Sequence, residues 1–438
     1  MTMHEDECEG CREYNELSRR QFITDAAGVS GLGVFAAVFP SWLPKVVLAE
    51  SYDSTRDVIV SIFLRGGADG LSLCVPFGDA NYYTSRPTIA IPRPDSTATA
   101  TRGIALDNFF MFPRAMQALV PAFQSTNLLI VHATGSVDPS RSHFDAQKFM
   151  EVGKPRDPSI VTGWLGRHLA SVPPMRTDAP LRALGFASGL QKTLIGAPKT
   201  LPISDPTTFG LAGATTTRTE RANWLKNEYG PAPEPLKASA LDALNTIDLL
   251  RLINFTGYTP ANGAVYPNSS FGRAMRSTAA LVKADIGIEA AQIDVGGWDT
   301  HATQDPVNPG GAMYNNMLGL ANALGAFHAD VIQGTQATNV TVVVISEFGR
   351  NVRENSARGT DHGRGNVMFA MGRNIAGGRV YAFNWPGLAR ENLQDGQDLK
   401  VTLDHRDILA EIVRNRLGNQ NTGVVFPDYV PTIRGVTK

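Results

Sequence analysis

The sequence predicts an α/β fold built on a doubly wound, mostly parallel sheet. Two apolar runs carry this prediction, residues 58–64 and 340–345, because both are rich in β-branched residues and both end at polar or Gly-rich segments. Such continuous runs are typical of strands that are buried on both faces. Stretches with helical periodicity separate further apolar runs, and strands that alternate with helices favour a parallel sheet.

The remaining elements follow in chain order. Shorter apolar runs predict strands at residues 128–131, 181–186 and 291–295. Helical periodicity predicts helices at residues 236–253, 274–286, 313–331 and 404–417. The Pro- and Gly-rich connections between these elements are more typical of loop insertions than of a second domain. We therefore expect one α/β domain over residues 57–420 and a C-terminal tail over residues 421–438.

The composition is that of a globular protein. The chain has 438 residues, of which 43 % are hydrophobic and 18 % are charged, so it can bury a substantial core. Its formal net charge is −1, and it contains no dense basic run. Proteins that bind nucleic acid usually carry a basic patch, so we expect no nucleic-acid partner.

The first 49 residues resemble a twin-arginine export signal. Arg19 and Arg20 precede a weakly apolar, Gly- and Ala-rich stretch, and small or apolar residues up to Ala49 offer a cleavage site. The alternative is an ordinary N-terminal helix. No later segment approaches the roughly 20 apolar residues of a membrane-spanning helix. We therefore expect a periplasmic or secreted protein, exported by the twin-arginine pathway, with no stable membrane span after cleavage.

Metal-type ligands follow several of the predicted strands. Because the carboxyl ends of parallel strands meet at one edge of a sheet, these side chains are expected to lie close together. In extended backbone, residues two apart point to the same side, so Asp299 and His301 can address one centre. Carboxylate oxygens mixed with imidazole nitrogens suit zinc, with calcium or another divalent ion as the alternative. The candidate metal ligands are Asp69, Asp299, His301, Glu347, Asp361 and His362.

Some of these ligands have a second interpretation. Asp361 in its Gly-flanked loop could instead cap a turn, as isolated Asp residues often do. Glu347 could orient a ligand histidine instead of binding the ion. Whether the site holds one ion or two stays open.

Residues 139–144 carry a candidate nucleophile. A serine in this segment could be activated by a metal, and Arg141 or His143 could stabilise an anion. We select Ser142 because it directly precedes His143 and a predicted helix, whose free N–H groups can help to bind an anion. The competing interpretation is that Ser140 or Ser142 only caps this helix.

Two arginines lie beside the candidate ligands. Arg65 and Arg350 could each bind phosphate or sulfate oxygens with two parallel hydrogen bonds. Either could instead pair with a nearby carboxylate, as arginines commonly do. The candidate catalytic residues are thus Ser142, His143, Arg65 and Arg350.

Five ordered motifs together resemble a known family. They lie at residues 64–71, 140–144, 297–301, 346–350 and 359–362, and they are similar to the motifs of the family labelled domain of unknown function 1501. That family is grouped with the alkaline phosphatase and sulfatase superfamily. The resemblance implies a doubly wound α/β fold with a metal site at the strand ends.

The resemblance also implies roles for individual residues. Asp69 matches the metal-binding Asp after the first strand, and Ser142 matches the nucleophile. Asp299 with His301, and Asp361 with His362, are similar to the two later ligand pairs of the superfamily. The sequence departs from the two-zinc pattern because Asp299 and His301 are two residues apart instead of four. The superfamily pattern also includes a further histidine ligand near the C-terminus. The only histidine there is His405, and its position also suits a helix start.

These observations favour an exported metal-dependent hydrolase of phosphate or sulfate esters, with a small anionic ester as its substrate. The ion would bind an anionic oxygen and activate Ser142 or a water molecule. The alternative is an exported binding or assembly protein that keeps the fold without catalysis and acts on a protein partner. A fold by itself does not specify chemistry, so the sequence leaves both open.

Overall fold

The computed structural model describes residues 55–334 and 339–438. The expected export signal, residues 1–49, lies outside these described residues. The strands are β1 Val58–Leu64, β2 Ile104–Ala105, β3 Met111–Phe112, β4 Leu128–Gly135, β5 Ala183–Gly185, β6 Thr200–Pro202, β7 Ala290–Val295, β8 Val340–Ser346, β9 Asn366–Met371, β10 Arg379–Tyr381 and β11 Leu403–Asp404. The α-helices are α2 Gly70–Leu73, α3 Ala80–Ser85, α4 Val120–Gln124, α5 His143–Val152, α6 Trp164–Ser171, α7 Arg218–Tyr229, α8 Leu236–Arg251, α9 Ser270–Lys283, α10 Ala312–Phe327, α11 His405–Asn415 and α12 Thr422–Val425.

The central sheet has nine strands and is mostly parallel. Its order is β10-β4-β9-β8-β1-β7-β5-β6, and β11 pairs with β4. Only β9 runs antiparallel to its neighbours, β4 and β8, in the described sheet. The α/β prediction is therefore confirmed, although β9 was not predicted. The chain leaves β8, forms a loop at the carboxyl edge and re-enters the sheet from that edge, so β9 has to run in the opposite direction.

The register of the central strands places the starts of three loops side by side at one edge of the sheet. Strand β1 pairs with β7 and β8, and Leu64 lies opposite both Val295 and Ser346. The three strands therefore end side by side. The segments that follow them, beginning at Arg65, Gly296 and Glu347, all start at the same edge of the sheet.

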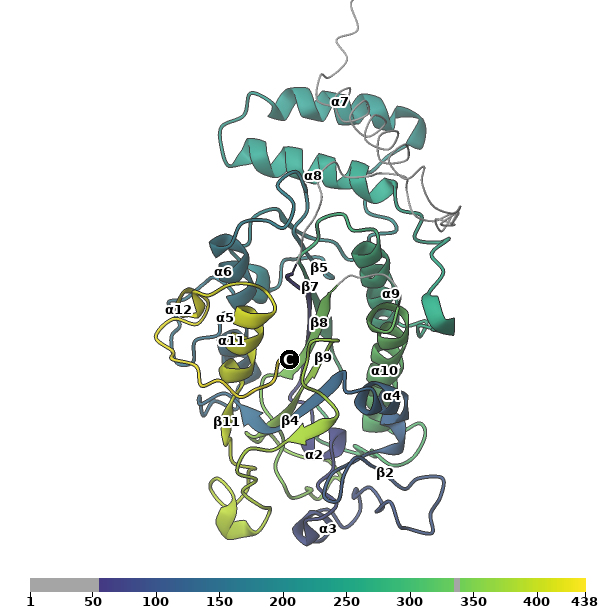
Figure 1. Cartoon of the computed structure of the whole chain (residues 1–438), viewed down its shortest axis with the longest axis vertical. Coiled ribbons are helices and arrows are strands. Elements are labelled where there is room, and N and C mark those ends of the chain that lie inside the picture. The colour runs from purple at the N-terminus through teal and green to yellow at the C-terminus, as the bar shows by residue number, and fades with distance from the viewer. Residues whose placement is uncertain (1–54, 335–338) are drawn as a thin grey trace, which may run out of the picture.

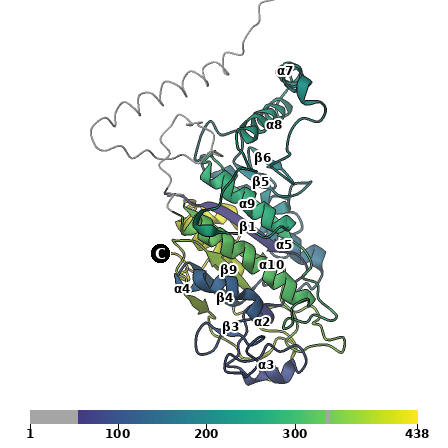
Figure 2. The ribbon, with the colours of Figure 1, turned by 90° about the vertical axis from the view of Figure 1, so that its right-hand side faces the viewer.

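Helices cover both faces of the sheet (Figure 1). Val60 and Ile62 alternate with Ile59 and Phe63 along β1, and the two pairs belong to different core clusters. The first cluster includes apolar residues of α9 and α10, and the second includes residues of α6 and α11. Figure 2 shows the same layering from the side. Burial on both faces explains why β1 and β8 read as continuous apolar runs.

Helices α7 and α8 lie at the end of the molecule opposite α2 and α3 (Figure 1). None of the residues of α7 is buried within the described structure. These two helices form an insertion that stands away from the sheet edge where the candidate ligands gather. No helix among the described residues has the length and apolar character needed to cross a membrane.

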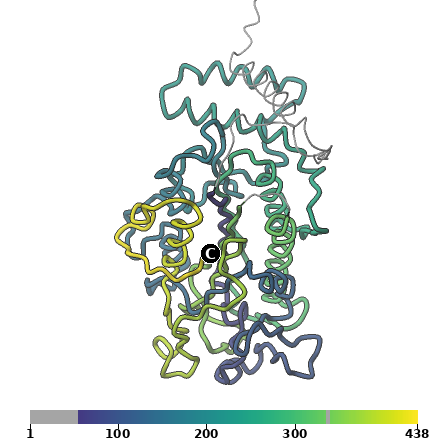
Figure 3. Tube along the Cα trace, in the orientation of Figure 1, coloured from purple at the N-terminus to yellow at the C-terminus, as the bar shows by residue number. Residues whose placement is uncertain are grey.

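The C-terminal segment packs against the domain instead of forming a loose tail. Residues 421–438 begin with α12 and run back across α11 (Figure 3). The Glu411 carboxylate of α11 accepts hydrogen bonds from the backbone N–H groups of Val436 and Thr437, among others. Phe426 and Val436 are fully buried. This segment therefore contributes to the core that supports α11.

Candidate metal centre

Three imidazoles and one carboxylate converge at the carboxyl edge of the sheet. His143 begins α5, Asp299 and His301 follow β7, and His362 follows β8. Asp299 Oδ1 lies 3.0 Å from His301 Nε2, 3.2 Å from His362 Nε2 and 3.6 Å from His143 Nε2. The Nε2 atoms of His301 and His362 are 3.0 Å apart. His143, Asp299 and His362 can offer ligand atoms that all lie within 4.8 Å of one another.

The second ring nitrogen of each histidine faces a hydrogen-bond acceptor. Nδ1 lies 2.8 Å from Glu347 Oε1 in His143, 2.8 Å from Asp361 Oδ1 in His301, and 2.9 Å from the Arg141 carbonyl oxygen in His362. Carboxylate and carbonyl oxygens only accept hydrogen bonds, so each neutral ring is assigned its proton on Nδ1 and its lone pair on Nε2.

This tautomer assignment leaves electron pairs facing one another. The Nε2 atoms of the three histidines all face Asp299 Oδ1, and their lone pairs repel this oxygen unless a proton or a metal cation lies between them. Ligand histidines in metal sites characteristically donate their other N–H to a carboxylate or a carbonyl, as these three do. The residues therefore fit a bound metal ion.

The charges around Asp299 and His362 favour the protonation states that bind metal. Although partial burial opposes ionisation, the Arg350 guanidinium, 2.6 Å from Oδ1, and His362 lower the pKa of Asp299 to about 2. Burial lowers the pKa of His362, which favours the neutral ring. The hydrogen bond to Glu347 raises the pKa of His143, so protons compete with a metal at this ring.

Arg350 is a buried link between loops. Its Nε donates to the Gly67 carbonyl at 2.5 Å, Nη1 donates to the Thr360 carbonyl at 2.8 Å, and Nη2 donates to the Trp298 carbonyl at 3.1 Å. These three residues follow β1, β8 and β7 respectively. With Asp299 as its ion partner, Arg350 holds the ligand-bearing loops together, and the structure favours the pairing interpretation over the binding of ester oxygens.

Arg65 is also used within the protein. Its guanidinium donates to Glu151 at 2.9 and 3.0 Å and to Asp294 at 3.0 Å. Glu151 is buried in α5, so this ion pair attaches the helix that carries His143 to the end of β1. These contacts favour the pairing interpretation for Arg65 as well.

Asp69 is not among the described residues whose donor atoms meet at this centre. The side chain is fully buried, and both carboxylate oxygens accept hydrogen bonds from Arg86. Burial alone would raise the pKa of Asp69, but Arg86 lowers it below its ordinary value. The resemblance placed a metal ligand here, whereas the structure supplies the positive charge from an arginine at the end of α3.

Glu347 and Asp361 each contact the Nδ1 atom of a histidine whose Nε2 atom faces Asp299. Glu347 Oε1 accepts from His143 Nδ1 and also from the Gln147 amide at 2.9 Å. Asp361 faces His301 Nδ1, and its neighbour His362 reaches the Asp299 carboxylate. Adjacent residues in extended backbone point to opposite sides, so Asp361 and His362 do not reach one ion together. The contacts of both carboxylates with histidine Nδ1 atoms therefore favour an orienting role for Glu347 and Asp361.

Ser142 stands at the N-cap position of α5, which starts at His143 as predicted. Its side chain is exposed and makes no capping hydrogen bond to the described helix. Its backbone N–H donates to Ser140 Oγ at 3.2 Å. The hydroxyl of the candidate nucleophile is therefore open to solvent, on the residue that precedes His143 in the chain.

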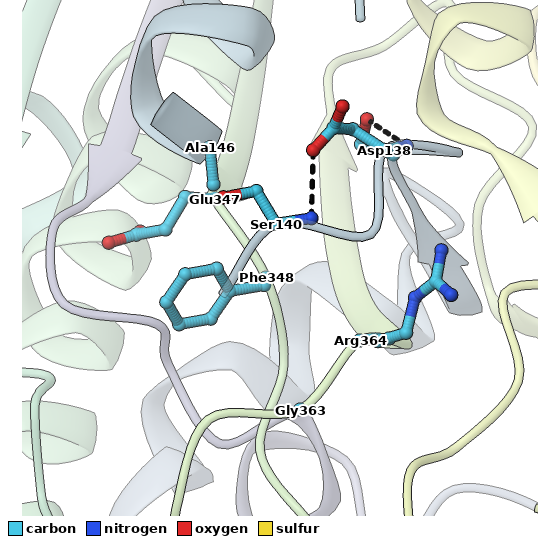
Figure 4. Close-up of a pocket in the computed structure, with 8 residues that line it drawn as sticks. Asp138, Ser140, Ala146, Glu347, Phe348, Gly363 and Arg364 are labelled. Carbon is cyan, nitrogen blue, oxygen red and sulfur yellow. Dashed lines mark hydrogen bonds between the residues drawn. The ribbon is translucent and has the colours of Figure 1, made fainter. Parts of the chain in front are cut away.

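A small pocket is lined in part by the segment that precedes α5 (Figure 4). Ser140, Glu347, Phe348 and Arg364 are among its lining residues, and its volume is about 10 Å³. Figure 4 shows Asp138 accepting the hydrogen bond from the Ser140 N–H, which measures 2.8 Å. This volume holds roughly one water molecule, so the pocket is too small for a substrate.

The metal centre itself opens to solvent. The side chains of Asp299 and His301 are 49 % and 43 % exposed. Structural metal sites are usually closed by protein ligands, whereas catalytic sites keep access for water and substrate. The candidate ligands Asp299 and His301 are therefore accessible to solvent.

The sequence pattern did not indicate that His143 is a donor. The sequence pattern predicts a group that stabilises an anion at this position, because Ser142 and a helix start lie beside it. The signal that was available is its place at a helix start after β4, at the same sheet edge as the Asp and His pairs. Arg86 and Gln147 carried no sequence signal, since they lie inside helical or loop segments without a ligand pattern.

The chain was compared with curated proteins and with solved structures. No curated protein matches the chain. A solved protein of the alkaline phosphatase superfamily from Vibrio parahaemolyticus has 12 % identity, covers 85 % of this chain and 71 % of its own, and gives a TM-score of 0.33. An alkaline phosphatase from the Antarctic bacterium TAB5 has 12 % identity, covers 73 % of this chain and 93 % of its own, and gives a TM-score of 0.29.

The match to a sequence family falls on the second half of the domain. It begins at α7, ends just past α11, and spans just under half of the chain. This stretch contains Asp299, His301, Asp361 and His362, whereas Ser142 and His143 precede it. Residues 224–420 match the model of a family described as protein of unknown function, DUF1501.

Proposed function

We propose that this protein is a metal-dependent hydrolase of phosphate or sulfate esters. Its divalent ion is held by His143, Asp299, His301 and His362. One observation carries the proposal: three histidines, each with its Nδ1 fixed by an acceptor, direct their Nε2 atoms toward one carboxylate oxygen at a solvent-exposed sheet edge.

The donor set favours zinc over calcium. Imidazole nitrogens suit zinc and similar transition-metal ions, whereas calcium prefers six or more oxygens. Asp299 Oδ1, His301 Nε2 and His362 Nε2 form a triangle with sides of 3.0, 3.0 and 3.2 Å. Donors at about 2.0–2.1 Å from a tetrahedral zinc ion stand roughly 3.3 Å apart. The triangle has the size of one face of such a tetrahedron.

The neighbouring residues supply the parts of an ester hydrolysis. When bound, the ion would polarise an anionic ester oxygen as a Lewis acid, with the oxygen in a fifth coordination position beyond the four protein ligands. The exposed Ser142 hydroxyl lies beside His143 and is our candidate for the attacking group. The first N–H groups of α5 have no partners within the helix, and a helix start of this kind favours a negatively charged substrate.

Metal analysis together with a panel of phosphate and sulfate esters tests this proposal. We expect the purified protein to bind zinc and to hydrolyse at least one class of ester. Chelation should abolish turnover, and added zinc should restore it. Bound metal without turnover on any ester would contradict the hydrolase and favour the binding or assembly protein. No metal and no turnover would contradict the centre itself.

Loss of an orienting carboxylate should weaken metal binding without abolishing it. We expect Asp361→Asn and Glu347→Gln each to raise the zinc dissociation constant by about 10–100-fold, which is the usual cost of losing such a partner of a ligand histidine. Competition with a chromophoric chelator measures this change. Asp95→Asn is a matched control, because this exposed carboxylate pairs with Arg93, away from the candidate ligands. Wild-type affinity in both test variants would remove the orienting role.

We also propose export through the twin-arginine pathway, which rests on Arg19, Arg20 and the residues before Ala49. Replacing both arginines with lysine should leave the precursor in the cytoplasm. Cell fractionation measures the location, and intact mass of the wild-type protein locates the cut. Normal export of the double-lysine variant would refute the pathway, and a mature chain that starts far from Glu50 would refute the cleavage site.

A further inference from the structure

We infer that Gln304 is a positioning residue that holds the two ligand-bearing loops in register and thereby sets the metal affinity. The inference rests on the proposed metal centre and extends it to a residue that provides no donor atom. Gln304 is fully buried in the segment between β7 and α10. Its backbone N–H donates to the Arg358 carbonyl at 2.9 Å, and its carbonyl accepts from Met313 at 2.8 Å.

One amide oxygen joins both loops. Gln304 Oε1 accepts from Thr360 Oγ1 at 2.7 Å and from Thr300 Oγ1 at 3.2 Å. Thr300 lies between the ligands Asp299 and His301 in sequence, and Thr360 lies two residues before His362. The Thr360 N–H also donates to the Thr300 carbonyl at 3.2 Å. A shift of either loop along the other would break these bonds.

Asp69 fixes the orientation of the Gln304 side-chain amide. Gln304 Nε2 donates to Asp69 Oδ2 at 2.6 Å and to Ser72 Oγ at 3.3 Å. A carboxylate only accepts hydrogen bonds, so the NH₂ group has to face Asp69 and the amide oxygen has to face the threonines. Arg86 neutralises the Asp69 charge on the other side. The aspartate that ends the first strand motif thus acts on the centre through Gln304 instead of through a direct bond to the ion.

Burial makes this network rigid. Asp69, Arg86, Gln304 and Thr360 each have 0 % of their surface exposed. Water cannot replace a hydrogen bond that is lost at such a depth, so each donor and acceptor strongly prefers its partner. The Asp299 and His362 donors are therefore held at one spacing before a metal binds, and preorganisation of this kind raises affinity.

Zinc affinity and cobalt spectroscopy of three variants test the inference. Gln304→Met preserves the side-chain length and removes both amide functions, and Thr360→Val removes one hydroxyl donor at nearly constant volume. Gln191→Met is the matched control, because Gln191 is a buried glutamine whose amide donates to the Gln292 carbonyl. Dissociation constants are measured by chelator competition at a temperature where circular dichroism shows each variant to be folded.

We expect Gln304→Met to weaken zinc binding by about 10–100-fold and to shift the visible spectrum of the cobalt-loaded protein. Thr360→Val should weaken binding by roughly 3–10-fold, as the loss of one hydrogen bond would. The double variant should bind no more weakly than Gln304→Met, because both changes remove the same bond. Gln191→Met should keep the wild-type affinity and spectrum.

The outcomes separate this inference from the proposed function. Tight zinc binding by the wild type with unchanged affinity in Gln304→Met would overturn the inference and leave the metal centre intact. An equal loss in Gln191→Met would also overturn it, since the effect would then be general destabilisation. If Gln304→Met does not fold, unchanged affinity in Thr360→Val overturns the inference. Failure of the wild type to bind any metal would overturn both.

Discussion

Asp299→Asn is expected to reduce zinc affinity by about two to three orders of magnitude. Zinc binding by four protein ligands contributes about 10–16 kcal/mol, so one ligand carries roughly 3–4 kcal/mol. Asp299 is the donor on which all three imidazoles converge, at 3.0, 3.2 and 3.6 Å. The asparagine keeps the volume and can still accept the hydrogen bond from Arg350, so the fold should change little.

Chelator competition and thermal melting on one preparation measure this result. Ester turnover should vanish at limiting zinc and recover in part when zinc is in excess, because the remaining imidazoles still offer a weaker site. Asp95→Asn serves again as the control carboxylate. Wild-type zinc affinity in a folded Asp299→Asn protein would show that Asp299 is not a ligand of the zinc ion.

Ser142→Ala is expected to lower kcat by several orders of magnitude while the metal stays bound. A covalent route cannot proceed without its attacking oxygen. Loss of an N-cap residue usually costs about 0.5–2 kcal/mol of stability. Because the Ser142 hydroxyl makes no capping hydrogen bond to the described helix, the free energy of unfolding should change by no more than the lower end of that range.

Turnover, metal content and melting temperature of the Ser142→Ala protein test this prediction together. Ser140→Ala is the control, since Ser140 Oγ accepts the Ser142 N–H and is the rival serine of the segment. Near-wild-type turnover in Ser142→Ala would remove this hydroxyl from the mechanism. A larger loss in Ser140→Ala than in Ser142→Ala would move the nucleophile to Ser140.

The sequence by itself determined the central strands of this protein and the sheet edge at which the candidate ligands lie. The β-branched run at Val58–Leu64 became β1 with the bounds that its pattern predicted, and β8 differs from its predicted run by one residue. Burial on both faces leaves such a pattern in any central strand of a parallel sheet, so it can be read locally. The same reasoning placed Asp299, His301 and His362 at the carboxyl edge, where they do meet.

Only the tertiary structure decided the direction of β9 and the partner of each charged group. Asp69, Arg65 and Arg350 all follow strand ends, as the candidate ligands do. In the folded chain Asp69 pairs with Arg86, Arg65 pairs with Glu151, and Arg350 pairs with Asp299. Glu347 and Asp361 orient histidines, and His143 joins the donors. The physical reason is that a strand end fixes where a side chain starts, whereas its partner depends on groups brought from distant segments, such as Gln304, which lies 235 residues from Asp69 in the chain.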